Sequence, residues 1–291
     1  MSSVFVFPGQ GAQVVGMGRE LYETNATARA VFDEVDDALN QKLSDIIFNG
    51  PMEELTLTAN VQPAIMATSI AMLRASGEKV PEYVAGHSLG EYTALCAAGA
   101  ISLADTARLL RVRGNAMQNA VPVGRGLVAV ILGLDIDTVR DICAKTDCDV
   151  ANDNCPGQVV ISGAKEIVET TMEKLKEVGA KRAMPLALSA PVHCRMQEPA
   201  AIEMRVALEN VEIQKPNAKF ISNKTADVIT EPSEIKDELV YQMTHGVRWR
   251  ESVLKMHELG ITEMVEIGPG NVLTGLAARI CPEINAKKLE D

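Results

Sequence analysis

Aromatic side chains are scarce in this chain, and long apolar runs are missing from it. Phe, Trp and Tyr make up 3% of the residues, which disfavours the base-stacking surfaces of proteins that bind single-stranded nucleic acid. The apolar runs are short, such as residues 127–132, and fall far below the roughly 18 residues that cross a bilayer. We therefore expect no contact with a membrane. The first residues reach Pro8 and Gly9 early, without a basic start, and predict a strand rather than a signal peptide.

Positive charge is also in deficit. The 28 Lys and Arg residues against 39 Asp and Glu give a net charge of -11, which disfavours a general nucleic-acid binder because phosphates would be repelled. The six cysteines form no C-x-x-C pair, which predicts reduced thiols in a cytoplasmic protein. The loop at residues 9–14 matches a dinucleotide fingerprint weakly, because Val14 replaces its third glycine. We expect neither a metal nor a cofactor.

The order of apolar and polar residues predicts an α/β protein. Its 291 residues suffice for one large or two ordinary domains, at roughly 150 residues per domain. Strands of a main domain are predicted at residues 3–7, 83–86, 219–222 and 263–267. Helices of the same domain are predicted at residues 28–39, 63–75, 89–98, 102–117, 196–208, 234–243, 250–259 and 272–279.

Residues 125–189 have a different pattern. Two glycines and a proline at residues 122–126 indicate a domain crossing. Beyond them, strands are predicted at residues 127–132, 149–151, 158–162 and 182–188, with helices at 136–144 and 165–178. This β-α-β-β-α-β order is the ferredoxin-like split motif. We therefore predict a main domain made of residues 1–124 and 190–291, with residues 125–189 inserted as a subdomain.

Residues 86–90 read Gly-His-Ser-Leu-Gly and match the G-x-S-x-G pattern between a predicted strand and helix. Flanking glycines permit a sharp turn that exposes the serine hydroxyl at a helix N-terminus, so Ser88 is the candidate nucleophile. The alternative is a Gly-Ser turn that only caps the helix. An oxyanion hole would take the backbone N–H of Leu89, and Gln10 in an early loop is the candidate for a second N–H.

A serine nucleophile needs a base within hydrogen-bond reach. Of the four histidines, His87 is part of the turn itself and should point away from the hydroxyl, and His257 lies in a charged amphipathic helix. His193 and His245 remain as candidates. The loop at residues 189–194 favours His193, because it lies where the inserted unit returns to the main domain, a common place for a cleft.

Several motifs together resemble one enzyme family, the malonyl-CoA:acyl carrier protein transacylases. They occur in the family's order at residues 8–13, 86–91, 113, 154–158, 191–193 and 268–270. The match runs nearly end to end. It implies a hydrolase-like α/β core domain with a short parallel sheet and an inserted ferredoxin-like βαββαβ subdomain. It also implies malonyl-CoA and acyl carrier protein as partners, and fatty acid synthesis as the pathway. We expect a monomer.

The resemblance also assigns roles to individual residues. It implies that Ser88 forms a malonyl ester, with His193 as general base. The backbone N–H groups of Gln10 and Leu89 would form the oxyanion hole. In this family a backbone carbonyl orients the histidine, and the matching residue here is Gln242. This removes a difficulty, because no aspartate in the sequence is an evident triad acid and a neutral acceptor can fix the tautomer.

Arg113 would hold the malonyl carboxylate. A carboxylate brought into a closed site needs a partner, and a planar guanidinium pairs with it through two hydrogen bonds. The alternative is that Arg108, Arg111 and Arg113 form a solvated face of one helix, which the residues alone favour. Val192 departs from the family, in which many members have Ser or an aromatic residue before the histidine, so malonyl specificity is less secure.

Two other activities remain open at this stage. One is an acyltransferase for another acyl-CoA. The other is a serine hydrolase or thioesterase, for which we would expect a triad acid and a lipase-type H-G-G-G loop, neither of which is evident.

Charge is distributed unevenly along the chain. Residues 181–255 contain 11 Lys and Arg and 10 Asp and Glu, a net charge of +1, so the remaining residues carry -12. Six cations of this stretch are candidates to attract phosphates or an acidic carrier protein: Arg195, Lys215, Lys219, Lys224, Arg248 and Arg250. The alternative is a solvated surface of mixed charge.

Overall fold

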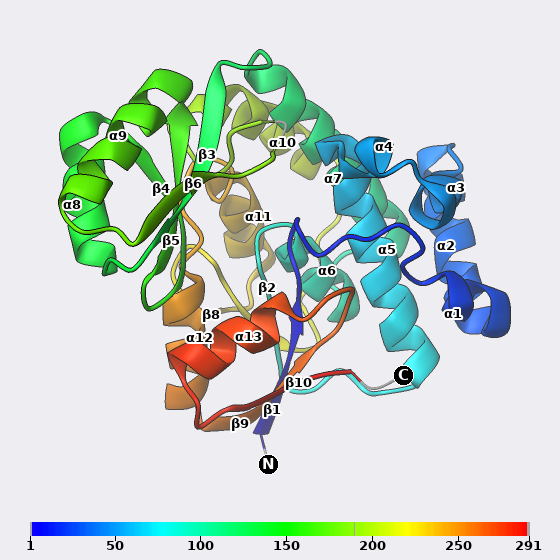
Figure 1. Cartoon of the computed structure of the whole chain (residues 1–291). Coiled ribbons are helices and arrows are strands. Elements are labelled where there is room, and N and C mark those ends of the chain that lie inside the picture. Colours follow the sequence, from blue (N-terminus) through cyan, green and yellow to red (C-terminus); the bar gives the residue numbers. More distant parts are fainter. Residues whose placement is uncertain (1, 189, 290–291) are drawn as a thin grey trace.

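The larger of two sheets contains strand β1 (Ser2–Phe7) in its middle (Figure 1). The computed structural model describes residues 2–188 and 190–289. The strand order is β10-β9-β1-β2-β7-β8, and all neighbours are parallel except β7 and β8. The other strands are β2 (Tyr83–Gly86), β7 (Lys219–Ile221), β8 (Val228–Ile229), β9 (Ile261–Glu266) and β10 (Asn285–Lys288). The predicted parallel core sheet is confirmed, and the sequence patterns missed β8 and β10.

Alternate side chains of β1 point into two separate cores, because helices cover both faces of the sheet. Phe5 and Phe7 lie in the larger core, whereas Val4 and Val6 pack with Trp249 in the smaller one. The larger layer contains α1 (Arg19–Thr24), α2 (Ala26–Leu39), α3 (Leu43–Asn49), α4 (Met52–Thr56), α5 (Thr58–Ser76), α6 (Gly90–Ala97), α7 (Leu103–Ala120), α10 (Glu198–Glu209) and α11 (Pro232–Tyr241). The smaller layer consists of α12 (Trp249–Glu258) and α13 (Val272–Ile280).

The second sheet is antiparallel, with the order β4-β5-β3-β6. Its elements are β3 (Gly126–Leu132), α8 (Ile136–Thr146), β4 (Asp149–Cys155), β5 (Gln158–Ala164), α9 (Lys165–Glu177) and β6 (Arg182–Pro185). This confirms the α/β core with a ferredoxin-like βαββαβ unit. Ala129 and Ile131 of β3 face the helices of the unit, whereas Val128 lies in a small cluster on the other face.

The exact ends of the inserted unit stay a prediction. β3 begins at Gly126, directly after the glycine-rich turn, but β6 ends at Pro185, before the expected residue 188. After Pro185 the Leu186 N–H still donates to the Val128 carbonyl, and a short turn follows. The expected boundary at Ser189 lies outside the described residues.

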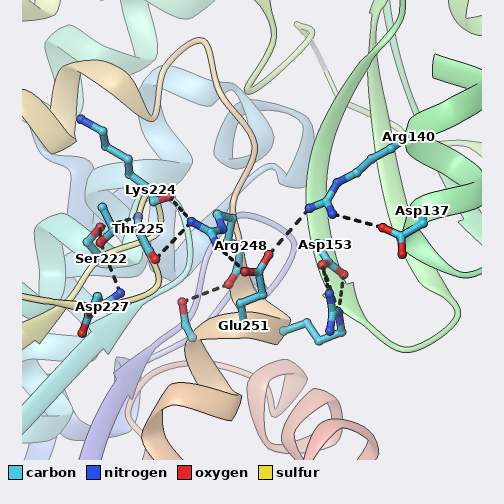
Figure 2. Close-up of polar contacts among 11 residues, drawn as sticks. Asp137, Arg140, Asp153, Ser222, Lys224, Thr225, Asp227, Arg248 and Glu251 are labelled. Carbon is cyan, nitrogen blue, oxygen red and sulfur yellow. Dashed lines mark hydrogen bonds and ion pairs between the residues drawn. The ribbon is translucent and has the colours of Figure 1, made fainter. Parts of the chain in front are cut away.

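Polar contacts attach the inserted unit to the core domain (Figure 2). The Arg250 guanidinium of α12 lies 2.9 Å from the Asp153 carboxylate of β4, whose side chain is 3% exposed. Arg140 of α8 reaches Glu251 of α12 at 3.7 Å. The Val247 backbone adds two hydrogen bonds to β4, one to each side of residue 152. These contacts hold β4 of the inserted unit against the core domain.

Among the described residues, no helix has the length and apolarity that a bilayer crossing requires.

Candidate active site

The turn between β2 and α6 places Ser88 at the end of a sheet strand. Ser88 has a φ of 56°, in the left-handed region that a non-glycine residue adopts only at a local cost. A Cβ on Gly86 would lie 1.9 Å from the Gly90 carbonyl carbon, and one on Gly90 would lie 2.1 Å from the Phe7 oxygen. Both glycines of the motif are therefore required by close backbone packing, and the turn is as sharp as the G-x-S-x-G pattern predicts.

His193 lies in hydrogen-bond contact with the serine. Its Nε2 atom is 2.7 Å from Ser88 Oγ, and its Nδ1 atom is 2.6 Å from the Gln242 carbonyl oxygen. Because that carbonyl only accepts, Nδ1 carries the proton and Nε2 is left free to accept the serine proton. Burial, and next the charge of Arg113, lower the pKa of His193 to about 3, so the imidazole is neutral at rest.

The other histidines are engaged elsewhere. His245 is exposed, stacks on the Tyr241 ring at 3.6 Å and hydrogen-bonds the Tyr241 carbonyl. His87 points away from the serine hydroxyl, as expected, and its Nε2 atom is 2.9 Å from Asn154 Oδ1. His257 is exposed on α12. Of the two candidate bases, His193 is the one that lies within hydrogen-bond distance of Ser88.

Arg113 is buried beside the nucleophile, not solvated with its neighbours on α7. Its Nη2 atom is 3.2 Å from Ser88 Oγ and 2.6 Å from Gln242 Oε1, and Nη1 is 2.7 Å from Gln62 Oε1. Arg113 is 1% exposed. Both of its amide partners are neutral, so they fix the guanidinium without neutralising its charge.

Gln10 and Leu89 both line the cavity next to Ser88. Leu89 directly follows the nucleophile and caps the N-terminus of α6. The Gln10 loop lies against the elbow, because a Cβ on Gly9 would be 2.8 Å from the His87 carbonyl oxygen. Both residues thus share the cavity with Ser88, as donors of an oxyanion hole would have to.

The cavity that contains these residues has a volume of about 560 Å³ and lies between the core and the inserted unit. The elbow, Arg113 and the start of α13 form its core side. Apolar side chains of the inserted sheet, such as Val128, Val130 and Val160, form the opposite wall. The cavity therefore combines the polar residues around Ser88 with a largely apolar opposite wall. Among the described residues, no group of three His, Cys, Asp or Glu side chains is arranged to hold a metal ion.

Residues 4–284 match the family model described as the acyl transferase domain. The malonyl CoA-acyl carrier protein transacylase of Bacillus subtilis is 47% identical over 283 residues, which are 95% of this chain and 89% of the relative. That of Escherichia coli K12 is 41% identical, covering 99% of this chain and 95% of the relative. The chain belongs to the malonyl-CoA:acyl carrier protein transacylase family.

Solved structures of this family have the same fold. An acyl-carrier-protein S-malonyltransferase from Bartonella henselae is 50% identical, with a TM-score of 0.97 over 100% of this chain and 96% of that chain. A malonyl-transacylase in complex with a type II PKS acyl-carrier protein is 41% identical, with a TM-score of 0.97 and the same coverage.

Sequence reasoning missed three residues of the transacylase site. Gln62 on α5 holds Arg113. Asn223, after β7, accepts from the Ser88 N–H at 2.9 Å and donates to the Gly86 carbonyl. Glu91, three residues after the nucleophile, accepts from the Asn223 N–H and from Gln242 Nε2. Glu91 could have been found from the sequence, because it directly follows the G-x-S-x-G motif. Nothing in the neighbouring sequence distinguishes Gln62 or Asn223.

The six cations predicted to attract phosphates or an acidic carrier protein have neighbours in the structure, and that role stays a prediction. Within the described residues, carboxylates pair with Arg195, Lys215, Lys219, Arg248 and Arg250. Lys224 instead lies over the Tyr241 ring, 4.4 Å from its centre. Three of these carboxylates, Asp149, Glu82 and Asp153, come from outside residues 181–255, so the cations of this stretch lie on a surface of mixed charge.

Proposed function

We propose that this protein transfers the malonyl group of malonyl-CoA, through an ester on Ser88, to the phosphopantetheine thiol of acyl carrier protein. The observation that carries the proposal is Arg113, a buried and unneutralised guanidinium with Nη2 3.2 Å from Ser88 Oγ. An acyl group on Ser88 that ends in a carboxylate would find its counter-charge there. The names of the relatives, malonyl CoA-acyl carrier protein transacylases, support the same substrates.

The reaction would proceed in two matching halves. In the first, Ser88 Oγ attacks the thioester carbonyl while His193 Nε2 takes its proton, and the Gln242 carbonyl stabilises the imidazolium through Nδ1. The C–S bond then breaks, and His193 returns the proton to the leaving thiolate. In the second half the carrier thiol gives its proton to His193 and attacks the Ser88 ester. The serine leaves with that proton.

The negative charge on the thioester oxygen would be stabilised by the backbone N–H groups of Gln10 and Leu89 and by the N-terminus of α6. A donor of this kind is worth about 2.7–4 kcal/mol in the transition state. The apolar wall formed by Val128, Val130 and Val160 suits the pantetheine arm that both substrates share. We also propose a cytoplasmic location, in keeping with six cysteines that are buried with free thiols, and a monomer.

Two rival activities are less well supported. A triad hydrolase would orient its histidine with a carboxylate, whereas His193 Nδ1 is bound to the Gln242 backbone carbonyl. An acyltransferase for an uncharged acyl-CoA would leave the charge of Arg113 buried without a substrate partner, which is unfavourable.

The test is the intact mass of the protein after brief exposure to malonyl-CoA and, separately, to acetyl-CoA. We expect a malonyl adduct on the wild type and none on Ser88→Ala, and loss of the adduct when holo acyl carrier protein is added. Absence of the adduct from the wild type, or its presence on Ser88→Ala, would sink the proposal. Loss of the adduct to water at the same rate without carrier protein would indicate the thioesterase.

A further inference from the structure

A buried carboxyl group lies beneath the nucleophile elbow and takes no part in the steps above. Glu91 is 0% exposed and occupies the first turn of α6. Its Oε1 atom accepts from the Asn223 backbone N–H at 2.7 Å, and its Oε2 atom accepts from Gln242 Nε2. Burying a carboxyl group is costly, and here each oxygen has a specific donor.

The contact with Glu91 determines which way the Gln242 side-chain amide faces. Its Nε2 atom donates to Glu91 and to the Ser88 carbonyl, at 3.2 Å in the latter case, while its Oε1 atom accepts from Arg113 Nη2 at 2.6 Å. The Oε2 atom of Glu91 accepts there, so the NH2 end of the amide faces it. A reversed amide would aim its NH2 group at the guanidinium, which has donors alone.

Glu238 of α11 is the acidic neighbour of Glu91. Burial, and next the charge of Glu238, raise the pKa of Glu91. The two Glu91 oxygens accept from Asn223 and Gln242. Glu238 itself accepts from Ser222 Oγ and the Lys224 N–H.

Two side-chain amide oxygens hold the guanidinium of Arg113, and one of them belongs to Gln242. Gln62 binds Nη1 at 2.7 Å and Gln242 binds Nη2 at 2.6 Å. If the Gln242 oxygen turned away, Nη2 would lose its hydrogen bond of 2.6 Å and keep the longer contact of 3.2 Å with Ser88 Oγ. The guanidinium would then lose the fixed plane that two-point recognition of a carboxylate requires.

We propose that Glu91 is a positioning residue for recognition of the acyl carboxylate: it sets the direction of the Gln242 amide, which in turn fixes Arg113. The inference rests on the proposed function, because it concerns selection of a dicarboxylic half-ester over an uncharged acyl group. Glu91 touches neither the acyl group nor the reacting atoms, and it acts through Gln242.

The variant Glu91→Gln tests this inference. The introduced carboxamide can accept from Asn223 through its oxygen, and its NH2 group then faces that of Gln242. We expect kcat/KM for acylation of Ser88 by malonyl-CoA to fall on the order of 10- to 100-fold, and that for acetyl-CoA to change less than about threefold. The matched control is Glu238→Gln, the same change in the same carboxyl pair without contact to Gln242, which should keep the wild-type ratio.

A second variant keeps the inference testable if Glu91→Gln does not fold. Gln242→Met retains the backbone carbonyl that binds His193 but removes the side-chain amide, so the malonyl preference should fall by a similar factor. In the double variant the two losses should not add, because both break one chain of contacts. Equal losses for malonyl-CoA and acetyl-CoA, or an unchanged ratio in Gln242→Met, would overturn the inference.

The outcomes also separate this inference from the proposed function. A wild type that forms the malonyl adduct, together with a folded Glu91→Gln variant that keeps the wild-type ratio, overturns the role of Glu91 alone. A wild type that forms no malonyl adduct overturns both.

Discussion

The Nη2 atom of Arg113 lies 3.2 Å from the Oγ atom of Ser88, although the two residues are 25 positions apart in the chain. One buried cation thus stands at the nucleophile itself. It affects two properties of the site, because it offers a partner to an acyl carboxylate and also disfavours a positive charge on His193. The choice of acyl group and the acid-base behaviour of the site are therefore linked.

Arg113→Ala should lose malonyl transfer far more than acetyl transfer. Hydrogen bonds to charged groups contribute about 1.5–3 kcal/mol, so we expect kcat/KM for malonyl-CoA to fall at least 10- to 100-fold. The control is Arg111→Ala on the same helix, where the guanidinium binds Asn60 away from Ser88. Equal losses with malonyl-CoA and acetyl-CoA would remove the proposed carboxylate role of Arg113.

His193→Ala should slow acylation of Ser88 by about 10²- to 10⁴-fold while substrate binding is largely kept, because the serine loses its general base. Stopped-flow or quenched-flow measurement of acyl-enzyme formation would report the rate constant directly. His245→Ala is the control, since His245 is exposed and stacked on Tyr241. If acylation by His193→Ala were unchanged, the assignment of the base would be wrong.

The rate constant for acylation of Ser88 should not fall as the pH drops through about 6.5, the ordinary pKa of a histidine. Because the pKa of His193 is lowered to about 3, its imidazole stays a free base through the mildly acidic range. We expect the acylation rate constant with acetyl-CoA, which has no carboxylate of its own, to stay level from about pH 7 to about pH 5. Arg113→Ala removes one cause of the lowered pKa, so its acid limb should move to higher pH. A wild-type limb near pH 6.5 would contradict the burial argument.

His193 should make the folded protein less stable in mild acid. In the unfolded chain His193 binds a proton below about pH 6.5, whereas in the folded chain it stays neutral until about pH 3. The unfolded state therefore binds more protons in this window, and stability falls as the pH drops through it. Between about pH 6.5 and pH 5 the loss is on the order of 2 kcal/mol. Urea unfolding of wild type and His193→Gln at both pH values would measure it, and a variant with an equal loss would refute the attribution.

Gly90→Ala should disrupt the elbow, whereas Gly275→Ala should be tolerated. A Cβ on Gly90 would lie 2.1 Å from the Phe7 backbone oxygen, and neither backbone can yield without moving Ser88. Nothing lies within 4 Å of a Cβ on Gly275, which is inside α13. There alanine should stabilise the protein by about 0.4–1 kcal/mol, because it restricts the unfolded chain. Thermal unfolding and Ser88 acylation of both variants provide the comparison, and a stable, active Gly90→Ala would show the packing argument to be wrong.

Features that depend on neighbours in sequence were predictable. The helix predicted to begin at residue 102 is confirmed, and the Ser102 hydroxyl caps it by accepting from the Asp105 N–H at 3.0 Å at the start of α7. The strand and helix on either side of Ser88 followed from apolar runs and glycines, since backbone hydrogen bonding and side-chain periodicity are local properties. The role of Arg113 did not follow in this way. Helical spacing places Arg108, Arg111 and Arg113 on one helix but does not say which of them meets another element.

The sequence by itself determined the elements, the elbow with its serine, and the inserted βαββαβ unit, because each depends on residues close together in the chain. Only the tertiary structure decided what surrounds the serine. The order of the parallel strands brings His193 to Ser88 across 105 residues and Gln242 to Ser88 across 154. Burial in that shared space, and not any local pattern, lowers the pKa of His193 and encloses the guanidinium of Arg113 beside Ser88.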